Sequence, residues 1–111
     1  HYLLRNASKM GQLWSEQLAP ALCEDFPQII HESNGTGLLQ ALVINQRVDF
    51  VKLKTALLKE GLLPFLMRNK LTNELTLMIT PPLTISEEEM HTIARGLSRA
   101  LHTVAKSMQS L

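Results

Sequence analysis

The sequence has a single cysteine, Cys23, and no long apolar run. One cysteine excludes an internal disulfide framework, and a reducing compartment is the simplest interpretation, so we expect a cytoplasmic protein. The apolar runs are far shorter than the ~20 residues that span a bilayer, so we expect no membrane partner. The first residues mix charged and polar side chains, which is not the pattern of a signal peptide.

The chain also lacks a charge excess of either sign. It has 11 Lys and Arg residues against 10 Asp and Glu residues, and the basic residues are scattered along the sequence, so we expect no nucleic-acid partner. Its length of 111 residues predicts one domain, 1–111. The chain starts at His1 within a helical pattern, which indicates a fragment of a longer protein or a processed product.

No cluster of residues indicates chemistry by itself. His91 and His102 are about three helical turns apart, beyond the reach of one ion, and we predict no metal site. Cys23 has no activating base nearby in sequence, so a structural role is the simpler interpretation. The acidic run 87–89 falls in the first turn of a predicted helix, where carboxylates complement the helix dipole.

The N-terminal residues have helical periodicity. Apolar side chains recur at helical spacing over about residues 2–19, which predicts an amphipathic helix that stops near Pro20. Residues 21–26 could continue the helix after a kink, and Pro27 would then end it.

Two strand-like runs follow, at 28–32 and 37–45. The stretch "SNGTG" between them predicts a tight turn made by Asn34, Gly35 and Gly37, because glycine and asparagine tolerate positive φ values.

A second helix is predicted from Asp49, an N-cap residue, to Gly61, which stands where a left-handed C-cap belongs. The runs "LLPFLMR" and "ELTLMIT" then predict a hairpin around "NKLTN". Pro64 cannot donate to a ladder, so it places the first of these strands at an edge or begins it.

The last helix has the clearest start signal. Ser86 and Glu89 form a capping box, and Ile85 and Met90 are spaced as a hydrophobic staple. A long apolar stripe follows. The complete order is α-β-β-α-β-β-α, which predicts an α+β fold with a small antiparallel or mixed sheet and helices packed on it. The exposed strand end at Thr80, Pro81 and Pro82 is the candidate for functional geometry.

The order and spacing of several motifs resemble the C-terminal small domain of class III pyridoxal-phosphate-dependent aminotransferases, in the ornithine and acetylornithine branch. These motifs are "SNGTGLLQALVIN", a helix ending in "KEGLL", and a strand running into "PPLTISEEEM" before a long helix. The resemblance covers nearly the whole chain. It implies a fold-type I enzyme that works as a homodimer, with pyridoxal phosphate held by a large domain outside these residues.

The resemblance also implies what this domain contributes. It closes over the substrate and presents an arginine to the substrate carboxylate, three residues before the first proline, so the substrate-side candidates are Met78, Thr80, Pro81 and Pro82. Here that position is Met78, and the family's turn arginine is replaced by Asn34. A thioether offers neither the charge nor the bidentate donors of a guanidinium.

Two functions therefore stay open. In the first, the chain is part of an aminotransferase that is active when intact, and the fragment alone binds no cofactor. In the second, it is a degenerate, non-catalytic relative kept for dimerisation or domain contact. The sequence does not identify the substrate or the amino donor.

Overall fold

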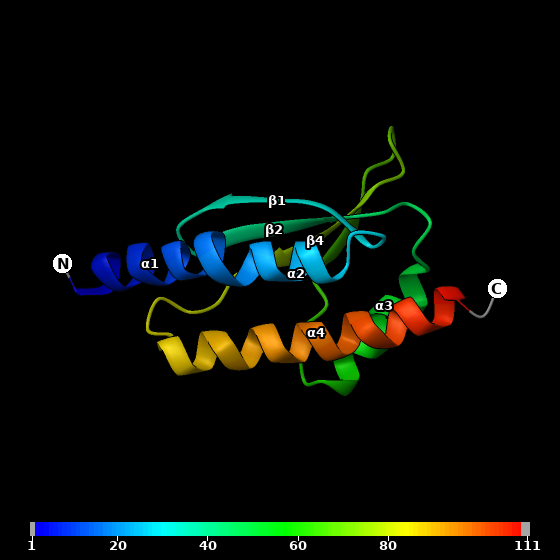
Figure 1. Cartoon of the computed structure of the whole chain (residues 1–111). Coiled ribbons are helices and arrows are strands. Elements are labelled where there is room, and N and C mark those ends of the chain that lie inside the picture. Colours follow the sequence, from blue (N-terminus) through cyan, green and yellow to red (C-terminus); the bar gives the residue numbers. More distant parts are fainter. Residues whose placement is uncertain (1, 110–111) are drawn as a thin grey trace.

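Helices and strands alternate in the predicted order. The computed structural model describes residues 2–109 (Figure 1). The elements are α1 (Tyr2–Leu13), the π-helix η1 (Trp14–Leu18), α2 (Ala19–Asp25), β1 (Ile30–Thr36), β2 (Leu39–Ile44), α3 (Phe50–Lys59), β3 (Leu66–Arg68), β4 (Leu75–Ile79) and α4 (Glu87–Gln109). The α+β prediction is confirmed. Among the described residues, no helix is both long enough and apolar enough to cross a membrane.

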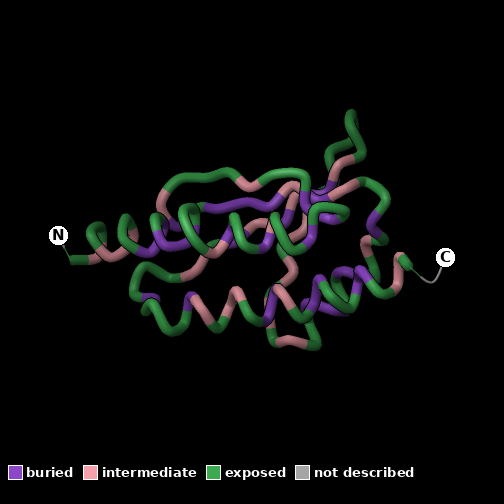
Figure 2. The backbone as a smooth tube through the Cα atoms, in the orientation of Figure 1, coloured by how far each residue is buried: buried purple, intermediate pink, exposed green. Residues whose placement is uncertain are grey.

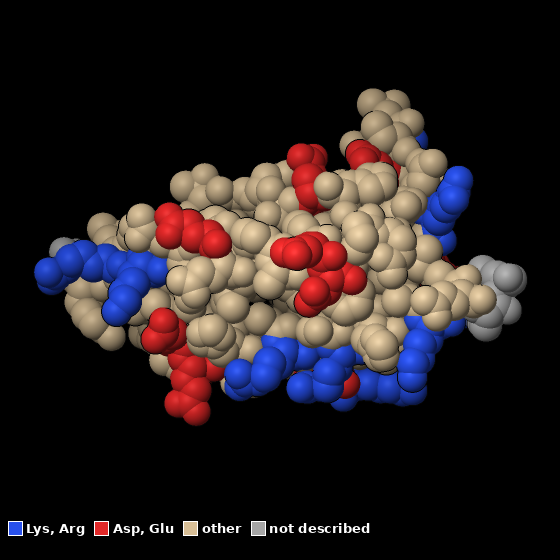
Figure 3. All heavy atoms as spheres, in the orientation of Figure 1, with Lys and Arg blue, Asp and Glu red and all other residues tan. Residues whose placement is uncertain are grey.

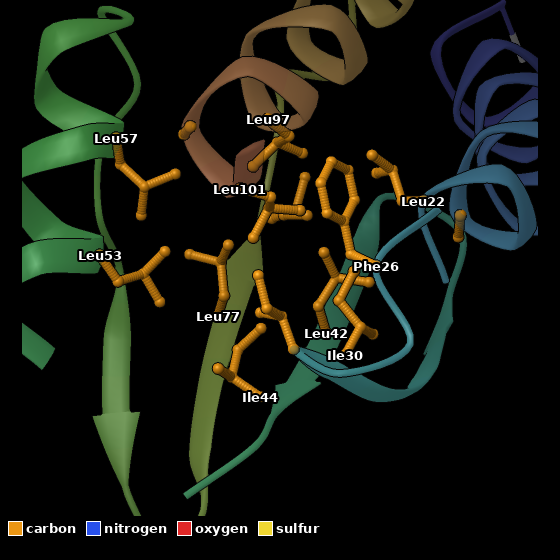
Figure 4. Packing of buried hydrophobic residues seen from close by; sticks show 14 of the residues in the cluster. Leu22, Phe26, Ile30, Leu42, Ile44, Leu53, Leu57, Leu77, Leu97 and Leu101 are labelled. Carbon is orange, nitrogen blue, oxygen red and sulfur yellow. The ribbon is translucent and has the colours of Figure 1, made fainter. Parts of the chain in front are cut away.

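The four strands form one sheet in the order β1-β2-β4-β3, and every neighbouring pair is antiparallel. The helices cover one face of this sheet. Figure 4 shows leucines of α3 and α4, with Leu22 and Phe26, meeting Ile30, Leu42, Ile44 and Leu77 of the sheet. Buried segments of helices and strands face one another in Figure 2, while the β3–β4 hairpin projects with an exposed tip.

The N-terminal helix does not stop at Pro20. The chain passes from α1 through the π-helical turn η1 into α2, with Pro20 in the first turn of α2. The N–H of Ala19 donates to the carbonyl of Trp14, the wider i to i+5 spacing of a π-helix. Proline is tolerated there because the first turn of a helix does not require its N–H. The predicted stop is therefore wrong, and the alternative continuation over 21–26 is correct.

The predicted "SNGTG" turn is wrong in extent. Asn34 and Gly35 lie within β1, opposite Ala41 and Gln40 of β2, so only Gly37 of the three predicted residues is in the turn. Gly37 has a φ of 57° at the first position of a two-residue connection, as a type II′ hairpin requires. Gly35 keeps a φ of 138° inside the strand, a value that other residues rarely adopt.

Other local predictions are confirmed. The Asp49 side chain accepts a hydrogen bond of 3.0 Å from the Lys52 N–H at the start of α3. Gly61 has a φ of 75° just after α3. Its N–H and that of the next residue bond back to carbonyls of the helix, closing a Schellman motif. Pro64 precedes β3, which is an edge strand.

Candidate functional site

The helices leave one face of the sheet uncovered, and we call it the outer face. Strand residues that pair directly across a ladder point to the same side of a sheet. One row of the outer face is Asn34, Ala41 and Met78, and the next contains Val43, Thr76 and Met67. The two positions where the resemblance expects arginine therefore lie in one row, separated by Ala41. Two strand spacings put them about 10 Å apart.

Neither row carries a basic side chain. Glu32, which pairs with Val43, is the one charged residue in the rows described above. Arg68, the arginine nearest to β4 in sequence, pairs with Leu75 and so belongs to the opposite side of the ladder. Its Nη1 donates to the Asn73 carbonyl oxygen at 2.8 Å, which holds it in the hairpin loop. Arg68 therefore does not replace the guanidinium that the resemblance expects at Met78.

The end of β4 adjoins two apolar hollows. One, of about 210 Å³, lies between the strand end and the helices. The other, of about 410 Å³, lies beside β3. Phe65, Met78 and Thr80 line both hollows, and Pro81 and Pro82 line the first. All four substrate-side candidates are thus brought together around one hollow. Its lining is apolar apart from the threonine, so it can enclose a hydrophobic group but cannot neutralise a charge.

Hydrogen bonds restrain residues 83–86, the segment between the prolines and α4. The predicted capping box is confirmed, because the Glu89 N–H donates to Ser86 Oγ at 3.1 Å and the Ser86 N–H donates to Glu89 Oε1 at 3.0 Å. These bonds from the backbone and side chain of Ser86 lower the pKa of Glu89.

Asn6 supplies a second restraint that sequence reasoning missed. From α1, its Nδ2 donates to the carbonyl oxygens of Leu83 at 2.7 Å and Ile85 at 2.9 Å. The partners are more than 70 residues apart in sequence, so no local pattern reveals the contact. The strand end and the start of α4 are therefore fixed relative to the N-terminal helix.

Cys23 lies in a setting that fits the structural role predicted from the sequence. Cys23 is half-buried, and this burial raises the pKa of its thiol, an effect that a hydrogen bond with the Ser33 side chain partly offsets. A raised pKa disfavours the thiolate and so disfavours a nucleophilic role. Within residues 2–109 no group of three or more His, Cys, Asp or Glu side chains could hold a metal ion.

Comparisons with known proteins connect this geometry to a family. No protein-family model matches the chain. A mitochondrial ornithine aminotransferase from rice is 33% identical over 107 residues, with 89% of this chain and 20% of that protein covered. The structure of an acetylornithine aminotransferase from Elizabethkingia anophelis has a TM-score of 0.72 and 28% identity, covering 90% of this chain and 25% of that one.

A lysine aminotransferase from M. tuberculosis shares the fold, with a TM-score of 0.76 at 24% identity over 92% of this chain and 22% of that chain. The predicted resemblance to aminotransferases is confirmed. The chain spans about a fifth to a quarter of the length of these relatives. It therefore corresponds to one segment of these longer relatives.

Proposed function

We propose that this chain, which is related in sequence and fold to a segment of ornithine aminotransferases, is the C-terminal small domain of a class III aminotransferase. The observation that carries the proposal is the match to the rice enzyme along most of this chain, together with the shared fold. The intact protein would transfer amino groups with pyridoxal phosphate, as a cytoplasmic homodimer. The partner of this domain in the same chain would be the large domain that binds the cofactor.

The lysines of the described residues lack the setting that a cofactor-bound lysine needs. All six lysines are exposed on helices or on the hairpin loop, and none lines the hollows at the end of β4. A lysine that bonds covalently to a cofactor needs a desolvated setting that lowers its pKa. Pyridoxal phosphate, which supplies an electron sink when bound, would therefore be held by residues outside this chain.

This chain would contribute an apolar surface to the active site. In the proposed assembly the outer face and the strand end, with Met78, Thr80, Pro81 and Pro82, close over the substrate and exclude water. Met78 and Ala41 would contact uncharged parts of the substrate, because neither can bind a carboxylate. A substrate carboxylate would then be bound by another part of the intact protein, or the substrate would lack one at this position.

The test uses the full-length protein reconstituted with pyridoxal phosphate. We expect an absorbance band of bound cofactor at the edge of the visible range, and amino-group transfer from an amine donor. Met78→Arg should change the KM for carboxylate-bearing donors, whereas Thr84→Arg, an exposed residue beyond the strand end, should not. A full-length chain that binds no cofactor contradicts the proposal.

A second candidate function is a non-catalytic domain retained for dimerisation or domain contact. The absence of basic side chains from the row of Asn34, Ala41 and Met78 favours it. This alternative predicts that the parent protein has no Schiff-base lysine with its aspartate partner. Sequencing the gene upstream of His1 separates the two functions, because both residues must be present in an active aminotransferase.

A further inference from the structure

The basic side chains, which look scattered in the sequence, gather in the fold. Seven of the 11 Lys and Arg residues lie in two segments, 47–60 and 95–109, which contain α3 and the later turns of α4 and only two carboxylates. These two segments therefore carry a net charge of +5, and the rest of the chain, which includes three glutamates in the first turn of α4, carries −4. Figure 3 shows Lys and Arg side chains along the lower edge, where α3 and the later turns of α4 lie, and a second basic group at the N-terminal end, while carboxylates gather at the start of α4 and over the middle of the molecule.

The basic residues form two stripes. Arg95, Arg99 and Lys106 are spaced by four and seven positions, which places them on one face of α4. Lys52 and Lys59 are seven positions apart and share one face of α3. The stripes are neighbours, because Lys52 Nζ donates to Ser107 Oγ of α4 at 2.8 Å and Arg99 Nε lies 2.7 Å from a Glu60 oxygen just after α3.

A groove of about 300 Å³ runs between the two helices, and we call it the α3–α4 groove. Val51, Ala56 and Val104 give it an apolar lining, while Lys52 and Lys59 bring two ammonium groups. The remaining lining residues are Thr55, Thr103 and Ser107. This combination fits a ligand that has both an apolar group, which would contact the valines and the alanine, and negative charges, which would contact the two lysines.

We propose that the α3–α4 groove binds an acidic polypeptide segment that also carries aliphatic side chains. The two groove lysines are about 10 Å apart along α3, from a rise of 1.5 Å per residue. The basic stripe of α4 extends about 16 Å by the same rise, longer than a small anion can occupy. The groove lining contains no aromatic residue, so it lacks the stacking surface that single-stranded nucleic acids use.

This binding does not depend on the proposed aminotransferase role, because none of the groove residues belongs to the outer face or the strand end. The groove is also distinct from the two hollows beside β4. A failure of either proposal therefore leaves the other standing.

The test measures fluorescence anisotropy of a labelled 14-residue peptide of Glu and Leu, titrated with the 111-residue chain. We expect saturable binding that weakens as salt is raised, because exposed charges are screened. The variant Lys52→Glu/Lys59→Glu should bind about tenfold more weakly. The matched control, Lys9→Glu/Lys70→Glu, makes the same charge change outside the groove and should bind within about twofold of the original chain.

Two comparisons exclude other classes of ligand. An oligothymidylate of equal length or phosphatidylserine vesicles should bind more weakly than the peptide, and tighter binding of either overturns the proposal. Absence of peptide binding, or equal losses in the two double variants, also overturns it. Amide chemical-shift changes on titration should centre on α3 and α4 in the unmodified chain, which provides a result independent of how the variants fold.

Discussion

Replacing Gly11 of α1 by alanine should destabilise the fold, although a helix interior normally prefers alanine. Alanine is favoured over glycine there by about 1 kcal/mol. A Cβ at Gly11, however, would lie 2.7 Å from the carbonyl carbon and 2.8 Å from the Cα of Gly37, and closer still to the Gly37 oxygen. These are backbone atoms of the β1–β2 turn, so no side-chain rotation relieves the overlap.

The turn is also restrained, because the Gly37 oxygen accepts a hydrogen bond of 2.6 Å from Gln40 Nε2. Overpacking of this kind costs about 1–3 kcal/mol. Because the overlap is with backbone atoms, the cost lies in the upper half of that range, and after subtracting about 1 kcal/mol of helix propensity we expect Gly11→Ala to lower the free energy of unfolding by about 1–2 kcal/mol.

Gly96 of α4 is the matched control. A Cβ there would lie 3.4 Å from Leu62 Cδ1, an ordinary contact with a side chain, so Gly96→Ala should raise the free energy of unfolding by about 0.5–1 kcal/mol. Urea unfolding followed by circular dichroism gives both values, read as changes in midpoint at constant slope. Equal or greater stability of Gly11→Ala than of the original chain would refute the close contact between α1 and the turn.

Further predictions concern the helix start, the cysteine and the α1 restraint. Ser86→Ala should cost about 1 kcal/mol of unfolding free energy in urea melts, as for other N-cap residues. The pKa of Glu89 is lowered in the folded state, so its contribution is present above the ordinary value of 4.5 and is lost as pH falls through the folded value. The stability advantage of the original chain over Glu89→Gln should therefore be present at neutral pH and absent in acid. Because burial raises the pKa of Cys23, iodoacetamide should alkylate it more slowly than a free thiol at pH 8, and faster as pH rises; a rate equal to that of glutathione contradicts this. Asn6→Asp keeps the side-chain size but removes two donated hydrogen bonds, and should cost about 1–2 kcal/mol in urea melts, with an unchanged midpoint contradicting the restraint.

Features set by short-range chemistry were predictable from the sequence. The capping box of Ser86 and Glu89, the Asp49 cap and the left-handed Gly61 each depend on a few neighbouring residues, and all three are in place. The order of elements followed from these signals and from the apolar periodicity. The edge position of β3 followed from Pro64 for the same local reason.

Features that depend on pairing between distant segments were not predictable. The stretch around Gly35 has the composition of a turn, but its pairing with β2 extends the strand to Thr36. Pro20 predicts a helix stop from local sequence, yet the π-helical hydrogen bonding of η1 lets the helix continue through it. Lys52 and Arg99 are 47 positions apart in sequence, and only the packing of α3 against α4 brings their stripes together. Each of these outcomes is set by tertiary contacts that outweigh the local preference.

The row of Asn34, Ala41 and Met78 decides what the proposed enzyme could do with this domain. An arginine at one position could be replaced by a neighbour on the same face, but the strand pairing leaves no such neighbour, since Arg68 belongs to the opposite side and is bound in its loop. Asn34 and Met78 are both uncharged, so restoring an arginine at one of them tests whether this face can bind a carboxylate. Met78→Arg restores a cation about 10 Å from Asn34 on a surface with one carboxylate nearby, Glu32. In an active full-length protein this substitution should lower the KM for a carboxylate-bearing donor more than the kcat changes, because it adds ground-state and transition-state binding alike. In a non-catalytic relative it should leave dimerisation and domain contact within about twofold, since an exposed charge contributes little to such contacts.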